Sequence, residues 1–436
     1  MNAVNIGLIG LGTVGSGTLS VLKRNTEEIS RRAGRAIKVL IIAVKDLDKK
    51  RDIELGDIQL TDNINDVVNH PQVQVVVEVV GGEGAILDAV IKALNNGKHI
   101  VTANKALIAL HGNKIFKTAQ AKGLVVAFES AVAGGIPVIK SIREGLSANR
   151  IEWLAGIING TSNFILSQMT EENRDFPDVL AEAQHLGYAE ADPTFDIEGI
   201  DAAHKLTILA SIAFGIALQF DKVYTEGITK ITSEDIIYAQ QLGYRIKHIG
   251  IAKKNDTGIE LRVHPTLIPK ERLIANVNDV MNAVLVQSDA AGPTLYYGAG
   301  AGAEATASAV VADLIDVVRA ITIDPESRVP YLAFQPDSIL DLPIMEMAEI
   351  ETAYYIRMEA VNKPGVMASI ATIFGANDIS IDSVVQKGSG IPNDLVTIIL
   401  LTHNTREGKL THALEQVEGL DTVKGEVNRI RLEQLS

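Results

Sequence analysis

The sequence of 436 residues contains no cysteine. Disulfide bonds, thiolate nucleophiles and cysteine-bound zinc are therefore excluded, and we expect a cytoplasmic protein. Positive charge is also in deficit, because 40 basic against 54 acidic residues give a formal net charge of −14. This balance argues against nucleic acid or an anionic membrane as a partner. No apolar run is long enough to span a bilayer, and the first residues lack the basic region of a signal peptide.

The composition that remains is that of an ordinary globular protein, with 47% hydrophobic and 22% charged residues. The length exceeds what one core accommodates, so we expect more than one domain. The pattern of elements predicts an α/β fold with an N-terminal Rossmann-type doubly wound sheet, an α+β substrate domain and a C-terminal ferredoxin-like βαββαβ domain. The expected boundaries are 1–135 with a return segment at about 300–320, then 136–299, a linker at 321–350, and 351–436.

A glycine motif follows the first predicted strand. The apolar run Val4–Ile9 leads into Gly10-Leu11-Gly12-Thr13-Val14-Gly15, and a helical segment is predicted from Val14 to Arg32. Glycines in this context permit a tight turn and a close approach of the backbone to a pyrophosphate at a helix N-terminus. The motif has a strand before it and a helix after it, which favours a dinucleotide site at Gly10, Gly12 and Gly15 over a plain glycine-rich turn.

The next predicted strand, Ile37–Val44, ends at Lys45 and Asp46. An acidic residue at this place is typical of NAD binding, whereas a cation favours the 2′-phosphate of NADP. Both signals are present, and further basic residues follow at 49–51, so we favour NADP and keep NAD as the alternative. Lys45 has a second interpretation as a solvated loop lysine. The distance from Gly15 to Asp46 also exceeds the ~20 residues of the general fingerprint.

Two later strand ends carry polar residues. The predicted strand His99–Thr102 is followed by Ala103-Asn104-Lys105, which places Lys105 towards the nicotinamide end of a bound cofactor. The predicted strand Leu124–Glu129 ends in a carboxylate followed by a glycine-containing turn. Glu129 with several backbone carbonyls could hold a hard cation, or it could be an ordinary charged strand end.

The segment Gly187–Lys205 holds five carboxylates and one lysine in nineteen residues. Turn residues place Glu190 on a loop, while the helical spacing after Gly199 puts Asp201 and Lys205 one turn apart on the same face. Such a pair could hold a substrate amine and hydroxyl while the lysine transfers a proton; the alternative is an exposed helix ion pair. The polar turn Asn159–Asn163 adds Gly160 and Thr161 as candidates for substrate contact, although turns and caps explain such residues equally well.

With these motifs in place, the chain resembles the homoserine dehydrogenases over essentially its whole length. The segment GYAEADPTFDIEGIDAAHK is the most specific part of the match, and the turn Asn362-Lys363-Pro364-Gly365 resembles that of an ACT domain. The resemblance implies reversible NAD(P)H-dependent reduction of L-aspartate 4-semialdehyde to L-homoserine, in the biosynthesis of threonine, methionine and isoleucine. It further implies a homodimer or homotetramer, a dimerisation role for the middle domain, and L-threonine as an effector at the ACT domain.

The resemblance also implies roles for particular residues. Lys205 corresponds to the family's proton donor, and Glu190 and Asp201 correspond to residues that hold the substrate. Lys105 corresponds to a lysine near the nicotinamide and the substrate. The positions implied to contact the cofactor are Thr13, Val14, Lys105, Ser130, Gly187 and Gly302. A structural sodium ion is implied at Glu129 with the carbonyls of Val132, Gly134 and Ile136.

Two other functions remain open from the residues themselves. One is a nicotinamide-dependent dehydrogenase of another small amino or hydroxy acid. The second is a sensor without catalytic activity that binds NADP and an amino acid. The dense carboxylate–lysine segment argues against the sensor, because a sensor needs no proton donor.

Overall fold

The structure is a computed structural model that describes residues 2–51, 53–387, 391 and 393–435. Its chain divides into two compact units built from interleaved segments. The first unit comprises Met1–Gly160, Asp201–Val223 and Val280–Leu342, and the second comprises Thr161–Ile200, Tyr224–Asp279 and Pro343–Ser436.

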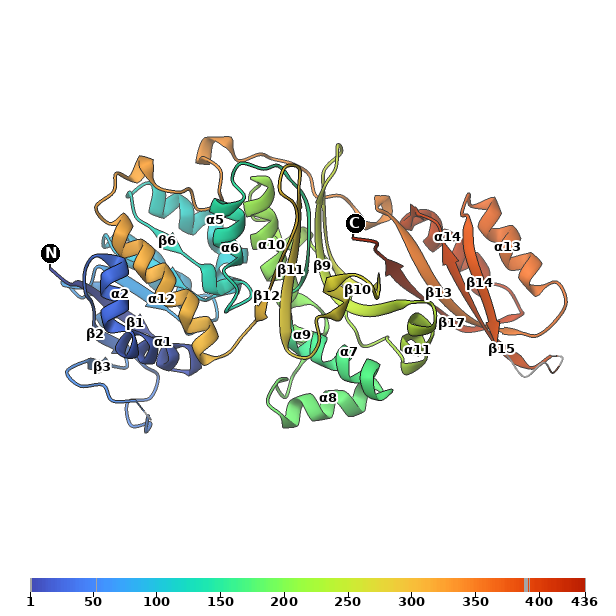
Figure 1. Cartoon of the computed structure of the whole chain (residues 1–436), viewed down its shortest axis with the longest axis horizontal. Helices are drawn as coiled ribbons and strands as arrows, with labels where there is room; N and C mark the ends of the chain where they lie inside the picture. The colour runs from blue at the N-terminus through green and yellow to red at the C-terminus, as the bar shows by residue number, and fades with distance from the viewer. Residues whose placement is uncertain (1, 52, 388–390, 392, 436) are drawn as a thin grey trace. The chain divides into compact units, whose positions relative to one another are not determined.

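A parallel sheet forms the core of the first unit (Figure 1). Its strands lie in the order β3-β2-β1-β4-β5-β6. Strands β1, β4 and β5 are apolar and almost wholly buried, as expected for a parallel sheet covered on both faces. The strand order reverses between β1 and β4, and doubly wound sheets bind their ligands at this point. The bounds are β1 Val4–Ile9, β2 Ile37–Ala43, β3 Gln59–Thr61, β4 Val75–Glu78, β5 His99–Thr102 and β6 Val126–Ala127.

The helix after the glycine motif differs from the prediction. The single helix expected from Val14 to Arg32 is wrong, because α1 Thr13–Arg24 ends at Asn25 and α2 Thr26–Ala33 begins after it. The hydroxyl of Thr26 donates to the carbonyl of Leu22, and such local side-chain bonds compete with a continuing helix. Three further helices of this region are α3 Ile64–Asn69, α4 Ala85–Asn95 and α5 Lys105–Gln120.

A distant segment of the chain returns to the nucleotide-binding sheet. Helix α12 Ala303–Ala320 packs against α1, and the two lie side by side in blue and orange in Figure 1. The contact is close: a Cβ added at Gly17 of α1 would lie 2.3 Å from the carbonyl oxygen of Ala303. The apolar face of α12 joins the core that contains residues of β1 and β4.

The rest of the first unit adds a buried helix and three antiparallel strands. Strand β7 Ile151–Ile157 pairs with β11 Met281–Ser288, which pairs with β12 Gly292–Ala299. Helix α10 Ile200–Phe214 is apolar around most of its surface and is buried along nearly its whole length. The strand expected to reach Glu129 stops at Ala127, because Glu129 begins the 3-10 turn Glu129–Ala131.

The second unit combines a long hairpin with the C-terminal module. Strands β9 Tyr244–Lys254 and β10 Ile259–Pro269 form an antiparallel pair, and the short β8 Tyr224–Thr225 runs parallel to β10. Its helices before the module are α7 Gly160–Glu172, α8 Phe176–His185, α9 Thr194–Ile197 and α11 Ser233–Gln241. Helix α7 begins at Gly160, within the polar turn Asn159–Asn163.

The C-terminal module has the predicted βαββαβ order. Its sheet runs β17-β13-β15-β14, and apolar residues of α13 and α14 share one core with three of these strands. The bounds are β13 Glu351–Val361, α13 Val366–Ala376, β14 Ile381–Lys387, β15 Leu395–Thr402, α14 Glu407–Glu418 and β17 Val423–Leu432. The expected α/β fold with a doubly wound sheet and a ferredoxin-like module is confirmed.

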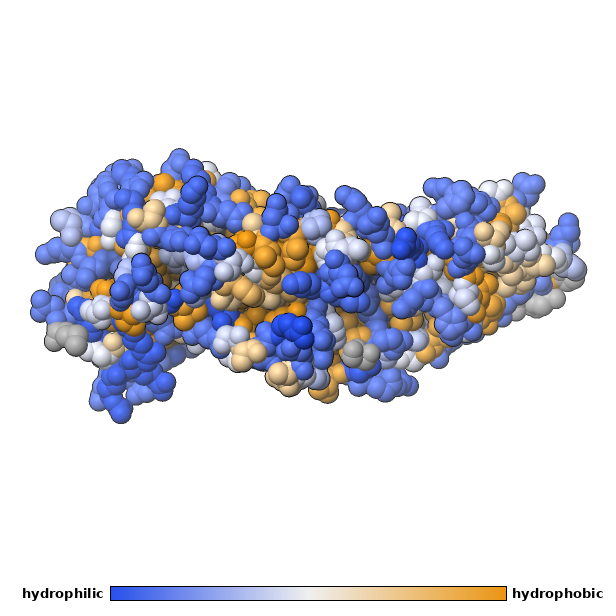
Figure 2. All heavy atoms as spheres, turned by 90° about the horizontal axis from the view of Figure 1, so that it is seen from above, coloured by the Kyte–Doolittle hydropathy of each residue, from blue (hydrophilic) through white to orange (hydrophobic). Residues whose placement is uncertain are grey.

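The surface is largely polar. Hydrophilic residues cover most of the face drawn in Figure 2, and apolar residues reach it in smaller patches. Among the helices of the described residues, none is long and apolar enough to cross a membrane.

Candidate active site

The glycine motif forms a tight turn with open space on one side. A Cβ at Gly15 would lie 2.3 Å from the carbonyl oxygen of Gly10, so only glycine permits this approach. Nothing lies within 4 Å of a Cβ built at Gly12, the N-cap of α1. No side chain caps the first turn of α1, which begins at Thr13 and Val14. An open helix N-terminus at the switch point of the sheet fits a pyrophosphate.

A buried carboxylate supports the neighbouring strand ends. Glu78 ends β4, accepts the backbone N–H groups of Val80 and Gly81 at 2.8 and 3.0 Å, and accepts the hydroxyl of Thr102 at 2.6 Å. It therefore fixes the turn after β4 to the end of β5. The hydroxyl of Ser130 donates to the carbonyl of Thr102 at 3.4 Å, so Ser130 belongs to the same edge. Glu78 is not among the residues predicted from the sequence, although it is the one acid in the otherwise apolar strand β4.

Three predicted residues come together in the first unit. Oδ1 of Asp201 lies 3.0 Å from Nζ of Lys105, and Oδ2 lies 2.7 Å from Nζ of Lys205. The expected Asp201–Lys205 pair is thus confirmed, although it is not an exposed one: the Asp201 side chain is 4% exposed and that of Lys205 is 12% exposed. Asn159 donates to the same Oδ2 at 2.8 Å, and Lys205 also donates to the carbonyl of Ile158 at 2.7 Å.

The cluster holds one negative charge between two positive ones. Burial alone would raise the pKa of Asp201, but the ammonium groups of Lys205 and Lys105 outweigh it and lower that pKa well below its usual range. Asp201 is therefore a carboxylate throughout the neutral range. Its oxygens accept from two lysines and one amide, so it fixes the orientation of both ammonium groups.

Glu129 sits in a second buried polar cluster. Its oxygens accept the N–H groups of Ile139 and Lys140, both at 2.9 Å, and its own N–H donates to Asp313. Burial, and then the negative charge of Asp313, raise the pKa of Glu129 to about 7. The backbone then turns through positive φ at Ala133 and Gly134. Within the described residues, no group of three or more His, Asp or Glu side chains is placed to hold a metal ion.

Two of the remaining substrate candidates, Glu190 and Thr161, lie in the second unit. Glu190 is exposed on the loop after α8, and its carbonyl accepts from the side chain of Gln184 at 3.1 Å. The hydroxyl of Thr161 donates to the carbonyl of Tyr188 at 2.7 Å, so Thr161 anchors this loop. Gly187 begins the loop with φ +76°. Gly160, in the first unit, is the first residue of α7.

The end of β2 presents Lys45 to solvent. Its neighbour Asp46 uses one carboxylate oxygen to accept the N–H groups of Asp48 and Lys49 at 2.9 and 3.1 Å. The acid therefore stabilises its own turn. Gly302 caps α12, which packs on the glycine helix α1.

The first unit contains both a dinucleotide-binding turn and a largely buried group that is able to exchange a proton. This combination is typical of a nicotinamide-dependent oxidoreductase. Family models match the chain over 10–129 (homoserine dehydrogenase, NAD binding domain), 137–315 (homoserine dehydrogenase) and 354–422 (ACT domain). The chain belongs to the homoserine dehydrogenase family, which confirms the resemblance inferred from its motifs.

Individual relatives match over their full lengths. The homoserine dehydrogenase of Pseudomonas aeruginosa is 63% identical over 436 residues, which is 100% of both chains. The crystal structure of a homoserine dehydrogenase from Thiobacillus denitrificans is 61% identical, with a TM-score of 0.96 over 100% of this chain and 99% of that one. A hyperthermophilic archaeal homoserine dehydrogenase mutant in complex with NADPH is 25% identical, with a TM-score of 0.62 over 72% of this chain and 97% of that one.

Replacing Asp201 tests the charge balance of the cluster. We expect Asp201→Asn to lower the free energy of unfolding at neutral pH by about 3 kcal/mol, because two ammonium groups lose their shared counter-charge. The folded state lowers the pKa of Asp201, so its contribution is present above the usual carboxyl pKa and is lost as pH falls. Urea unfolding should show the difference from wild type shrinking in acid. Equal losses in Asp201→Asn and in the exposed control Asp221→Asn would contradict this account.

Proposed function

We propose that the chain catalyses the reversible reduction of L-aspartate 4-semialdehyde to L-homoserine with NAD(P)H. Membership of the family supports the reaction. The observation that carries the assignment of residues is the Asp201 carboxylate held between Lys105 and Lys205. It pairs the largely buried Lys205 and the partly exposed Lys105 with one buried carboxylate, in the unit that holds the nucleotide turn.

Lys205 is the proton donor in this proposal. The nicotinamide, when bound, supplies the hydride to the aldehyde carbon. The oxygen of that aldehyde gains negative charge and needs a proton, which the ammonium of Lys205 gives. Asp201 keeps Lys205 charged before the reaction, and Lys105 adds positive field without leaving its carboxylate partner. In the reverse direction the neutral amine of Lys205 accepts the proton of the homoserine hydroxyl.

Glu190 is proposed to bind the ammonium group of the amino-acid substrate. It is an exposed carboxylate on a loop that Thr161 and Gln184 fix through backbone carbonyls. A fixed loop presents the charge at low entropic cost. Gly160 and Thr161 complete the set at the start of α7, where Thr161 acts by holding the loop.

Lys205→Met tests the proton donor. With L-aspartate 4-semialdehyde as substrate, we expect the rate of NADPH consumption at saturation to fall about a thousandfold, because the variant keeps the length of the side chain but has no proton to give. The exposed Lys222 of the same unit supplies the control variant Lys222→Met, which should retain full activity. Full activity in Lys205→Met would move the proton donor elsewhere, with Lys105 the next candidate. No turnover by the wild type would favour the sensor.

NADP is the proposed preferred cofactor. Lys45 is exposed at the end of β2, whereas the carboxylate of Asp46 is engaged by its own turn. The contacts to the dinucleotide are assigned to Gly10, Gly12, Gly15 and Lys45, and to Thr13, Val14, Lys105, Ser130, Gly187 and Gly302. The relative in complex with NADPH is consistent with this preference.

Lys45→Ala should therefore change cofactor selectivity. We expect the KM for NADPH to rise about tenfold, equivalent to ~1.4 kcal/mol, because a cation facing the 2′-phosphate is lost. The KM for NADH should stay within about twofold. Steady-state kinetics with both cofactors measure this, and Lys38→Ala, on the strand β2 that precedes Lys45, is the control. Equal changes for NADPH and NADH would assign Lys45 to the solvated loop.

A structural sodium ion is proposed at Glu129 with the carbonyls of Val132, Gly134 and Ile136. The backbone passes through positive φ at two successive residues of this turn, and the carboxylate is already fixed by two backbone N–H groups. Oxygen ligands of this kind suit a hard cation. Exchange of sodium for choline at constant ionic strength would leave the melting temperature unchanged if the assignment is wrong.

The domain boundaries expected from the sequence are also proposals. Residues 1–135 with 300–320 are assigned to the cofactor, 136–299 to catalysis and dimerisation, 321–350 to a linker and 351–436 to the ACT domain.

Regulation by an amino acid is proposed at the ACT domain. L-threonine is the proposed effector, which the match to the ACT family model supports. The protein is proposed to be a homodimer or homotetramer. Unchanged activity and melting temperature in millimolar threonine would remove that effector, and light scattering gives the oligomeric state.

A further inference from the structure

A buried arginine of the C-terminal module joins that module to the rest of the second unit. Arg431 lies on β17, where it pairs in parallel with Thr266 of β10. Its side chain is 1% exposed. A guanidinium in such a place must be satisfied by carboxylates and hydroxyls around it, and its partners show which segments it holds together.

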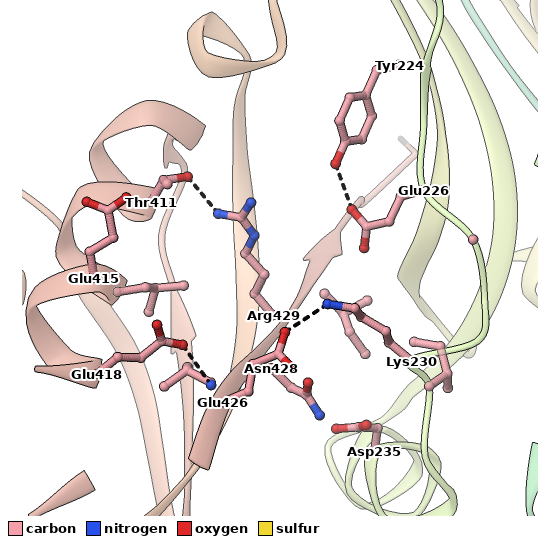
Figure 3. A pocket seen from close by; sticks show the side chains of 15 residues that line it. Tyr224, Glu226, Lys230, Asp235, Thr411, Glu415, Glu418, Glu426, Asn428 and Arg429 are labelled. Atoms are coloured by element: carbon pink, nitrogen blue, oxygen red, sulfur yellow. Dashed lines mark hydrogen bonds and ion pairs between the residues drawn. The ribbon is translucent and has the colours of Figure 1, made fainter. Parts of the chain in front are cut away.

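The partners of Arg431 come from both sides. Nε donates to Glu407 of α14 at 2.7 Å, within the module. Nη1 donates to Glu226 at 2.7 Å, and Nη2 donates to the hydroxyl of Tyr224 at 3.2 Å. Tyr224 in turn donates to Glu226 at 2.9 Å, as Figure 3 shows. One side chain of the module therefore bonds to two residues of the segment 224–229, whose backbone also pairs with β10.

Glu226 is only partly enclosed. Its side chain is 32% exposed, and it lines a cavity of about 390 Å³ between this segment and the elements α14 and β17 (Figure 3). Arg431 also pairs with Glu407, so a neutral side chain at position 226 leaves the buried guanidinium with one carboxylate partner.

The segment 224–229 is in direct contact with the C-terminal end of residues 187–199, the substrate loop, which carries Glu190. A Cβ at Gly227 would lie 2.4 Å from Oε2 of the Glu198 side chain and 2.7 Å from the carbonyl oxygen of Ile197, so the backbone at Gly227 packs tightly against both residues. The N–H of Ile228 donates to the carbonyl of Ile197 at 2.9 Å. Ile197 ends α9, and Glu198 follows it directly.

Helix α9 is the continuation of the loop that carries Glu190. The hydroxyl of Ser162 donates to the carbonyl of Asp196 at 2.9 Å, and that of Thr161 donates to the carbonyl of Tyr188 at 2.7 Å. The loop is therefore fixed by α7 on one side and by the segment 224–229 on the other. Only the second of these supports depends on the C-terminal module.

We propose that Arg431 and Glu226 are positioning residues for the substrate loop. Through the segment 224–229 they set the place of Glu190, and with it the affinity for the ammonium end of the amino-acid substrate. The C-terminal module thus contributes to substrate binding even without an effector. This inference rests on the proposed function of Glu190. The contacts that hold the loop are independent of that function.

Glu226→Gln tests the proposal with little change of volume. In the full-length protein we expect the KM for L-homoserine to rise about fivefold, with kcat and the KM for NADP⁺ within about twofold, as for mutations along a coupled network. Hydrogen exchange should become faster in the peptides that cover 187–199. Gly227→Ala should give the same pattern, because its methyl group displaces Glu198 without removing a charge.

Glu234→Gln is the matched control. Glu234 also pairs with an arginine of the module, Arg357 at 3.0 Å, and its side chain is 42% exposed, but it lies on α11 outside the segment 224–229. This variant should change neither the KM nor the exchange of 187–199. Unchanged exchange in Glu226→Gln, or equal acceleration in both variants, would overturn the proposal. Faster exchange in Glu226→Gln alone, with no turnover of homoserine by the wild type, would support the positioning of the loop and refute the proposed reaction.

Discussion

The candidate active site depends on one interaction, the buried carboxylate of Asp201 between two ammonium groups. A lone ammonium in this place would be costly to bury, and two of them would repel each other. The carboxylate of Asp201 compensates the charges of both ammonium groups and fixes their orientation. The proposed chemistry follows from that arrangement, because a lysine that stays charged can supply a proton and a second one can stabilise the developing negative charge.

The fold brings the two lysines to Asp201 by different routes. Lys205 is on the same helix, one turn further on, so a single buried helix fixes the pair. Lys105 is the first residue of α5, directly after β5 of the nucleotide-binding sheet. The cluster thus ties the helix that carries the proposed proton donor to the edge of the sheet that is proposed to bind the cofactor. Asn159, which follows β7, adds an uncharged donor to the same Oδ2 of Asp201 that accepts from Lys205.

Much of this organisation is predictable from local patterns. The strand, glycine turn and helix around Gly10–Gly15 are fixed by sterics that act over a few residues, and the spacing of Asp201 and Lys205 follows from helix geometry. The break at Asn25 was missed, because a helix-forming segment gave no sign of the competing bond made by Thr26. The junction of Lys105 with Asp201, the support of Glu78 and the contact of Arg431 with Glu226 are tertiary. These contacts join segments that are far apart in the sequence, so the spacing of residues along the chain does not predict them. The functional roles of these residues remain predictions.

The most direct measurement is the pH dependence of homoserine oxidation, with chemistry rate-limiting, in wild type, Lys205→Met and Lys105→Met. A lysine amine in a model peptide titrates near ~10.4, so its neutral form grows about tenfold for each pH unit below that value. The account predicts that the wild-type rate rises with this slope from about pH 7 to about pH 9, that Lys105→Met is slower but keeps the slope, and that Lys205→Met loses it. A slope that persists in Lys205→Met would contradict the central claim, since another group would then be taking the proton.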